Sequence, residues 1–180
     1  PNFTMRDRVA EYIYAGDLLG NMWKFDVRSA TPSDWSLATK RSVLFTANAG
    51  QPVTTRPIVG RHPLGGRLVY FGTGKFLEAV DNNVSGAVTQ SFYAIWDQGT
   101  GATVPRTDLL QQQIEVIRTN ADYSLRVITN NQINWRISSS TPPSHLGWYL
   151  DLPTTGEKQI TNSILRDDRI IFTTYIPSTT

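Results

Sequence analysis

The sequence of 180 residues predicts an all-β protein. Five Trp, seven Tyr and seven Phe suit pleated sheets, on which wide rings pack well. Many short runs rich in aromatic and β-branched residues are separated by turn residues, as strands usually are. These strand-like runs cover residues 11–16, 21–27, 42–48, 67–73, 91–97, 123–129, 133–138, 147–152 and 169–176.

The first two runs, 11–16 and 21–27, are predicted to form a β-hairpin. In the second run every other side chain is aromatic or aliphatic, which is the period of a half-buried strand. The chain must reverse direction between the two runs. Gly20 and Asn21 are residue types that accept positive φ, so we expect them to make the turn.

The runs 42–48, 67–73 and 91–97 follow, and each is predicted as a strand from its aromatic and β-branched content. Two stretches could instead be short helices. The first is 74–83. The second, 106–118, fits an apolar helical face and also fits a strand, and we predict a strand there.

The last four runs, beginning at residues 123, 133, 147 and 169, are predicted as strands for the same reason. The charged stretch 165–169 is expected to be a turn before the last strand. No low-complexity linker divides the chain, so residues 1–180 are predicted to be a single segment.

The composition excludes several kinds of site. The chain has no cysteine, which rules out disulfides, thiolate metal sites and a cysteine nucleophile. Its net charge is +2 with scattered basic residues, so we expect no nucleic-acid partner. No run approaches the roughly 18 apolar residues of a membrane span, and we expect none.

A weak internal repeat suggests how the strands are arranged. The pattern apolar-Tyr-x-Gly occurs at Tyr14–Gly16 and again at Tyr70–Gly72, at a separation near that of one four-stranded propeller blade plus a loop. Glycine at a strand end often lets another backbone approach closely, and we expect this at Gly16 and Gly72. Two hairpins of a β-sandwich could produce the same repeat, so the repeat alone favours a propeller and a β-sandwich equally.

Six stretches carry a more specific signal, because they resemble the C-terminal region of the PilY1 family in the same order. That family comprises large adhesins associated with the tip of bacterial type IV pili. The stretches "YAGDLLGNMWKFDV" and "GWYLDLPTTGEKQI" are the most specific of the six. The resembling blocks are residues 14–27, 43–47, 69–78, 90–97, 147–160 and 170–178.

The resemblance implies a modified seven-bladed β-propeller, similar in its repeats to quinoprotein propellers. We therefore expect several antiparallel blades with one or two short helices. A seven-bladed ring needs more chain than this at roughly 40–50 residues per blade. The chain is accordingly expected to hold the later blades and to be a fragment of a longer protein.

The resemblance also implies a calcium loop of the form D-x-D-x-D-x-x-x-D before the "YAGD" strand, with alternating oxygen ligands for a hard cation. In this sequence the four ligand positions fall on Phe3, Met5, Asp7 and Glu11. Two of the four are apolar. Asp7 and Glu11 could form a residual cation site, but we favour a solvated polar turn and expect no bound cofactor.

Other chemistry finds little support. His62 and His145 lack metal-ligand spacing to each other and are interpreted as surface or packing residues. Ser85 lacks a G-x-S-x-G elbow, so no serine hydrolase is indicated. The stretch "FGTGKF" lacks the full dinucleotide-binding pattern and is interpreted as a turn. A quinoprotein dehydrogenase would need a complete ring, and we therefore predict that the chain is not an enzyme.

Acidic and aromatic residues leave one alternative open. A pair among Asp97, Asp151, Asp167 and Asp168 could in principle act as in a glycosidase. Trp residues 23, 96, 135 and 148 could stack on sugars, although in strands they are more often core residues. A quinoprotein-like or carbohydrate-binding propeller is therefore the alternative function.

The resemblance implies a tip-associated adhesin and pilus biogenesis factor that supports attachment, twitching motility and the balance of pilus extension and retraction. Its expected partners are minor pilins and a host or abiotic surface. Its expected location is the pilus tip and cell surface, with periplasmic or outer-membrane association also open. The stretches 27–41 and 53–66 are the candidate contact loops, and ordinary connections are an equal alternative.

Overall fold

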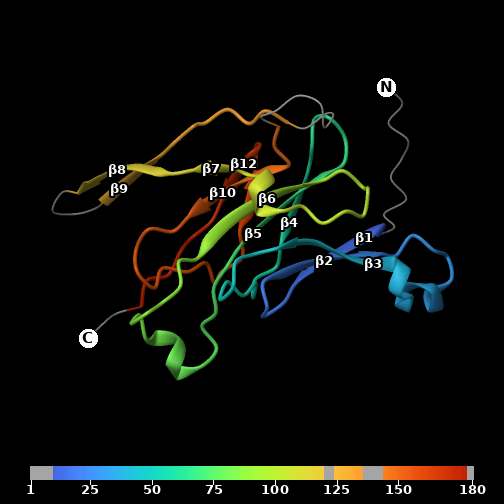
Figure 1. The fold of residues 1–180 in the computed structure, drawn as a ribbon, viewed down its shortest axis with the longest axis horizontal. Helices are drawn as coiled ribbons and strands as arrows, with labels where there is room; N and C mark the ends of the chain where they lie inside the picture. The colour runs from blue at the N-terminus through green and yellow to red at the C-terminus, as the bar shows by residue number, and fades with distance from the viewer. Residues whose placement is uncertain (1–9, 120–123, 136–143, 178–180) are drawn as a thin grey trace.

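The computed structural model describes residues 10–119, 124–135 and 144–177, and within them the protein is all-β (Figure 1). Four 3₁₀ turns accompany the strands in those residues. No helix of the described part is long and apolar enough to cross a membrane. The 3₁₀ turns are η1 (Pro32–Ser36), η2 (Ala38–Lys40), η3 (Ala79–Asn82) and η4 (Arg106–Asp108).

The first sheet is antiparallel and contains β1 (Tyr12–Gly16), β2 (Asn21–Asp26) and β3 (Arg41–Thr46), in that order. β1 and β2 form the predicted hairpin, with Tyr12 opposite Asp26. A register shift between Met22 and Trp23 interrupts the pairing of β2 with β3.

The second sheet has five strands, and its central strand β6 is buried along its whole length. Such burial explains the continuous apolar character of this strand. Adjacent strands of this sheet pair antiparallel, except for β10 and β7, which run parallel. The order is β4 (Ile58–Arg61), β5 (Arg67–Gly72), β6 (Ser91–Asp97), β10 (Gly147–Asp151) and β7 (Leu110–Gln112).

Two further hairpins complete the described fold. β8 (Ile114–Thr119) and β9 (Ser124–Ile128) form an arm that extends away from the body of the molecule in Figure 1. β11 (Ile164–Arg166) and β12 (Arg169–Ile171) are joined at residues 167 and 168, which both have positive φ.

The main hydrophobic core brings together side chains of the first two sheets. Met22 and Phe45 come from the first sheet, and Phe71, Tyr93 and Ile95 from the second. All five are at most 1% exposed. The rings of Phe45 and Tyr93 have centroids 4.7 Å apart, so the two sheets are in direct aromatic contact. Such contacts add to the stabilisation from buried apolar area.

The sequence predicted most of these strands correctly. In the stretch 106–118, the predicted strand is confirmed as β7 and the greater part of β8, after the single turn η4. The charged stretch 165–169 is confirmed as containing the turn before the last strand. Also confirmed are the predicted strands at 11–16, 21–27, 42–48, 67–73, 91–97 and 147–152, and the predicted strand 123–129 from residue 124 onward.

Several predictions need correction. The expected loop 53–66 contains β4, which forms by pairing with β5. The possible helix 74–83 is only the turn η3, because it has no buried apolar face and its one turn is held by a capping box between Glu78 and Asp81.

Near the C-terminal end, the predicted strands are shorter than expected. In the predicted strand 133–138, Trp135 makes an isolated bridge to His145, and residues 136–138 lie outside the described residues. The predicted strand 169–176 ends at Ile171 because β12 pairs only with the short β11, and Tyr175 then makes an isolated bridge to Lys158.

Candidate functional site

A buried ion pair joins the two main sheets. Lys24 on β2 lies 2.6 Å from the carboxylate of Asp97 on β6, and both residues are at most 6% exposed. The hydroxyl of Tyr14 donates a 2.5 Å hydrogen bond to the same carboxylate. Burial acts to raise the pKa of Asp97, but the bonds from Lys24 and Tyr14 outweigh it and lower the pKa. The cluster fixes how the sheets sit together.

The turn between β1 and β2 is organised around Asp17. Its carboxylate accepts hydrogen bonds from the backbone and side chain of Asn21 and from the indole N–H of Trp23. Gly20 has φ of 87°, as predicted for the turn. Asn21 takes part in the turn through its hydrogen bonds to Asp17, but it begins β2 and does not have the expected positive φ.

A neighbouring segment lies close to both strand-end glycines, with a backbone oxygen among the near atoms at Gly16 and only side-chain atoms at Gly72. A Cβ on Gly16 would overlap the side chain of Val53, and one on Gly72 would meet the side chain of Gln159. Gln159 is 1% exposed and belongs to a buried polar run with Glu157 and Lys158. The burial of this run was not predicted, because a stretch of charged and amide residues normally indicates solvent exposure.

A second polar network surrounds Asp151. Its carboxylate accepts from Ser91 at 2.5 Å and from Arg106 at 2.8 Å, and Arg106 also bonds the hydroxyl of Tyr93. Asp151 pairs in register with Ser91, whereas Asp97 lies at the far end of the same strand. The six residue steps along β6 from Ser91 to Asp97 place the two acids about 20 Å apart.

That separation exceeds the roughly 5–9.5 Å between the carboxylates of a glycosidase pair. Asp97 and Asp151 are also each neutralised by a cation. The other two candidates, Asp167 and Asp168, lie in the turn between β11 and β12. Asp97 and Asp151 are therefore too far apart to act together as a glycosidase pair, and each is held in an ion pair.

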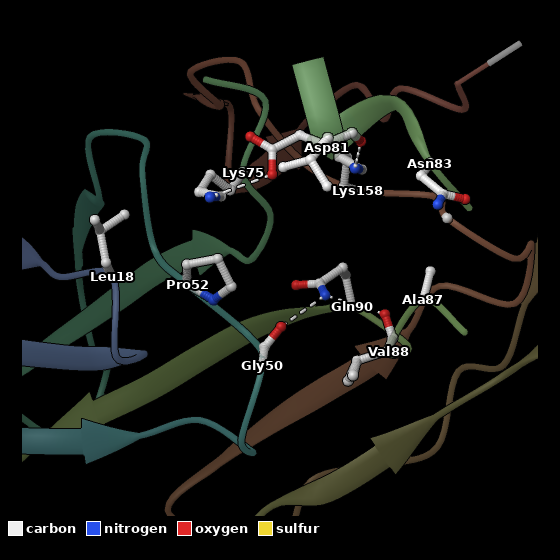
Figure 2. Close-up of a pocket in the computed structure, with 12 residues that line it drawn as sticks. Leu18, Gly50, Pro52, Lys75, Asp81, Asn83, Ala87, Val88, Gln90 and Lys158 are labelled. Carbon is white, nitrogen blue, oxygen red and sulfur yellow. Dashed lines mark hydrogen bonds and ion pairs between the residues drawn. The ribbon is translucent and has the colours of Figure 1, made fainter. Parts of the chain in front are cut away.

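A pocket of about 390 Å³ with a mixed polar and apolar lining opens beside η3 (Figure 2). Its one carboxylate, Asp81, is held by Lys75 at 3.3 Å and by two backbone N–H groups. Lys158 donates to the backbone oxygen of Asp81 at 2.7 Å. Gln90 donates to the carbonyls of Gly50 and Val88, and its buried Oε1 has no partner within the described residues. These groups mainly bond one another, and the one carboxylate is engaged in an ion pair with Lys75.

A larger groove of about 650 Å³, which we call the aromatic groove, lies between the end of β9, β10 and the segment after β12. It combines indole and phenyl rings with amide side chains and aliphatic groups. Its lining residues are Gln112, Ile128, Thr129, Asn130, Asn131, Gln132, Ile133, Trp135, Trp148, Leu150, Ile170 and Phe172.

Of the predicted calcium positions, Asp7 lies outside the described residues. The carboxylate of Glu11 pairs with the guanidinium of Arg67. In the described part of the chain, no three acidic or histidine side chains gather in a way that could hold a metal ion. The Glu11–Arg67 pair therefore fits a calcium ligand set poorly, because the cation would have to displace an arginine.

His62 is confirmed as a packing residue. It is 4% exposed and its ring stacks on Trp96 at 3.9 Å, with Trp135 edge-on at 4.3 Å. Burial lowers the pKa of His62. Trp96 is a core residue at 4% exposure, whereas Trp135 and Trp148 line the aromatic groove. Their convergence was not visible in the sequence, because the two residues lie on separate segments.

Comparison with known proteins first gives the class. The PilY1 beta-propeller domain family matches residues 4–125, which is more than half of the chain. The match and the all-β architecture identify a β-propeller domain sequence. No solved structure matches the chain.

The chain also matches curated relatives. A type IV pilus biogenesis factor PilY1 homolog of Xylella fastidiosa is 31% identical over 185 residues, which cover 95% of this chain and 12% of the relative. The type IV pilus biogenesis factor PilY1 of Pseudomonas aeruginosa is 31% identical over 182 residues, which cover 83% of this chain and 16% of the relative. The chain therefore spans less than a fifth of these relatives. It belongs to the PilY1 family.

Proposed function

We propose that the protein acts at the tip of the type IV pilus as an adhesin and biogenesis factor. It supports surface attachment and twitching motility and helps to balance pilus extension against retraction. Membership of the PilY1 family, whose compared members are named type IV pilus biogenesis factors, is the observation that carries this proposal.

The fold supports a mechanical role of this kind. The Lys24–Asp97 pair and the shared aromatic core hold the two main sheets as one packed unit. In a pulled sheet, load along the strands is shared by many backbone hydrogen bonds. The connection 27–41 is the better of the two candidate contact loops, because the stretch 53–66 contains the paired strand β4, whereas Trp35 and Leu37 lie in the connection and are 41% and 50% exposed.

The proposed partners are minor pilins and a host or abiotic surface. The proposed location is the exported pilus tip and cell surface, with a periplasmic or outer-membrane stage. We further propose that the protein is not an enzyme. Absorbance of the purified intact protein tests this against the quinoprotein alternative, since a bound quinone would colour it and we expect no colour.

The calcium loop is proposed to be degenerate. Only Asp7 and Glu11 retain carboxylates among its four positions, and Glu11 is engaged by Arg67. Calcium binding of the usual kind takes six to eight oxygen ligands, which this set does not supply. No step of the proposed function depends on a bound calcium ion.

The test is a count of surface pili in cells whose intact protein lacks this segment, in normal and retraction-blocked backgrounds. We expect pili to be lost in the normal background and to return when retraction is blocked. A variant with Trp35→Ala and Leu37→Ala is the matched comparison, and should keep its pili while attaching less. Unchanged pili and unchanged attachment after deletion would refute the proposal.

A further inference from the structure

The aromatic groove combines three chemical properties in one cavity. Indole and phenyl rings lie on it, amide side chains border it, and none of the described residues that line it is charged. Its volume of about 650 Å³ falls within the range of small-molecule sites, roughly 300–1,000 Å³. The groove is therefore suited to a neutral ligand that has both apolar faces and hydrogen-bonding groups.

The rings are held from behind by other aromatic side chains. Phe92 is fully buried and stacks on Phe172 at 4.0 Å with an 8° angle between the rings. Phe92 also contacts Trp148 at 6.0 Å. Trp135 packs edge-on against the buried His62 at 4.3 Å. These supports fix the ring orientations before any ligand arrives, which lowers the entropic cost of binding.

The amide side of the groove is fixed by a buried glutamine. Gln112 is 8% exposed, and its Oε1 accepts from the hydroxyl of Thr129 at 2.6 Å and the backbone N–H of Asn131 at 3.0 Å. Its Nε2 donates to the backbone oxygen of Asn131 at 2.8 Å. Asn131 is thus held by Gln112, and its neighbours Asn130 and Gln132 are both exposed at the groove.

We propose that the aromatic groove binds a neutral carbohydrate of a surface glycan. The C–H faces of a pyranose ring suit the indole faces of Trp148 and Trp135, and its hydroxyls both donate to and accept from amides such as Asn130 and Gln132. An acidic or basic ligand would lack a counter-charge here, and a purely aliphatic one would leave the amides unpaired. The biological meaning of this site rests on the proposed adhesive function.

The first test is a glycan array on which neutral oligosaccharides are printed beside their sialylated counterparts, probed with the intact protein. We expect binding to neutral glycans and weaker binding to each sialylated partner. The best neutral oligosaccharide is then titrated calorimetrically. No array binding by folded protein, or equal binding to neutral and sialylated members, would overturn the proposal.

Variants locate the binding. Trp148→Ala is expected to weaken it about thirtyfold, as truncation of a central aromatic contact does. Leu19→Ala removes a 78% exposed apolar side chain from the turn between β1 and β2 and serves as the control, with unchanged affinity expected. If Trp148→Ala does not fold, Asn130→Ala and Gln132→Ala, which change exposed side chains, should each weaken binding severalfold without lowering the melting temperature. Unchanged affinity in these variants would overturn the assignment to this groove.

The results also separate the site from the proposed function. Absent glycan binding together with the expected retraction-dependent loss of pili would overturn the glycan site and leave the pilus function standing. Binding that depends on Trp148 together with unchanged pili and attachment would support the site and refute the pilus function. Preference for an uncharged apolar peptide over every glycan would overturn the carbohydrate assignment.

Discussion

Replacing Lys24 with methionine is expected to lower the free energy of unfolding by about 3 kcal/mol, the lower end of the range for removing one partner of a buried ion pair. Methionine retains much of the apolar packing of the lysine stem. Asp97, 3% exposed, would lose its cation but keep the hydroxyl of Tyr14 at 2.5 Å and the backbone N–H of Gly99 at 2.8 Å. These two remaining donors are the reason for choosing the lower end.

Urea unfolding of the wild type, Lys24→Met, Asp97→Leu and the double variant gives the assay as a double-mutant cycle. The double variant should be more stable than either single variant, because it leaves neither charge buried alone. Arg28→Met is the control, since Arg28 is 56% exposed in its pair with Asp26 and no measurable change is expected.

The pH dependence provides a second measure of the same cluster. The folded state lowers the pKa of Asp97, so its contribution is present above the unfolded value near 3.9 and is lost as pH falls through the folded value. In Lys24→Met the loss of stability should begin at higher pH, because burial raises the pKa of Asp97 and the lowering effect of Lys24 is gone. A cost below about 1 kcal/mol for Lys24→Met, as for an exposed pair, or a double variant no more stable than both single variants would refute this reasoning.

Three further outcomes are expected. Gly16→Ala should cost about 1–3 kcal/mol of stability in urea unfolding, because its Cβ would overlap Val53, and an unchanged midpoint would contradict this. His62→Phe should flatten the fall in stability from pH 7 to pH 5; burial lowers the pKa of His62, so its contribution is present above the unfolded value near 6.5 and is lost as pH falls. Millimolar calcium should raise the melting temperature by no more than about one degree, whereas a saturable rise abolished by Asp7→Asn would contradict the degenerate loop.

Local patterns predicted the strands that make most of the fold. The apolar run of β6 and the alternation in β2 are properties of single segments, so each strand can be predicted without knowing which strand it pairs with. The close approaches at Gly16 and Gly72 were likewise predictable, because a glycine that ends an aromatic strand commonly leaves room for a neighbouring segment.

The missed strands depend on their partners. β4 has only four residues in a stretch rich in proline and glycine, and its pairing with β5 defines it. β11 exists because Asp167 and Asp168 both adopt left-handed φ and return the chain as β12. Aspartate tolerates that conformation better than most residues, but the sequence did not show that two in succession would use it.

The candidate sites were the least predictable part. The aromatic groove takes side chains from β7, the loop after β9, β10 and the segment after β12, and only the fold brings them together. The burial of residues 157–159 was unpredictable for a different reason. Its polar side chains are satisfied by distant partners, such as Arg126 for Glu157 and Thr55 for Gln159, so burial carries no apolar signature in the sequence.

The stretches that resemble the PilY1 family contain the residues that lock the sheets together, including Tyr14, Lys24 and Asp97. The resemblance to the family therefore includes residues that stabilise the fold. Two of the groove rings, Trp148 and Phe172, also fall within those stretches, whereas Trp135 and the amide-bearing loop 129–132 fall outside them. If the rings provide the stacking surface and the amides select among sugars, related proteins should share binding of a sugar ring but differ in the glycan that they prefer.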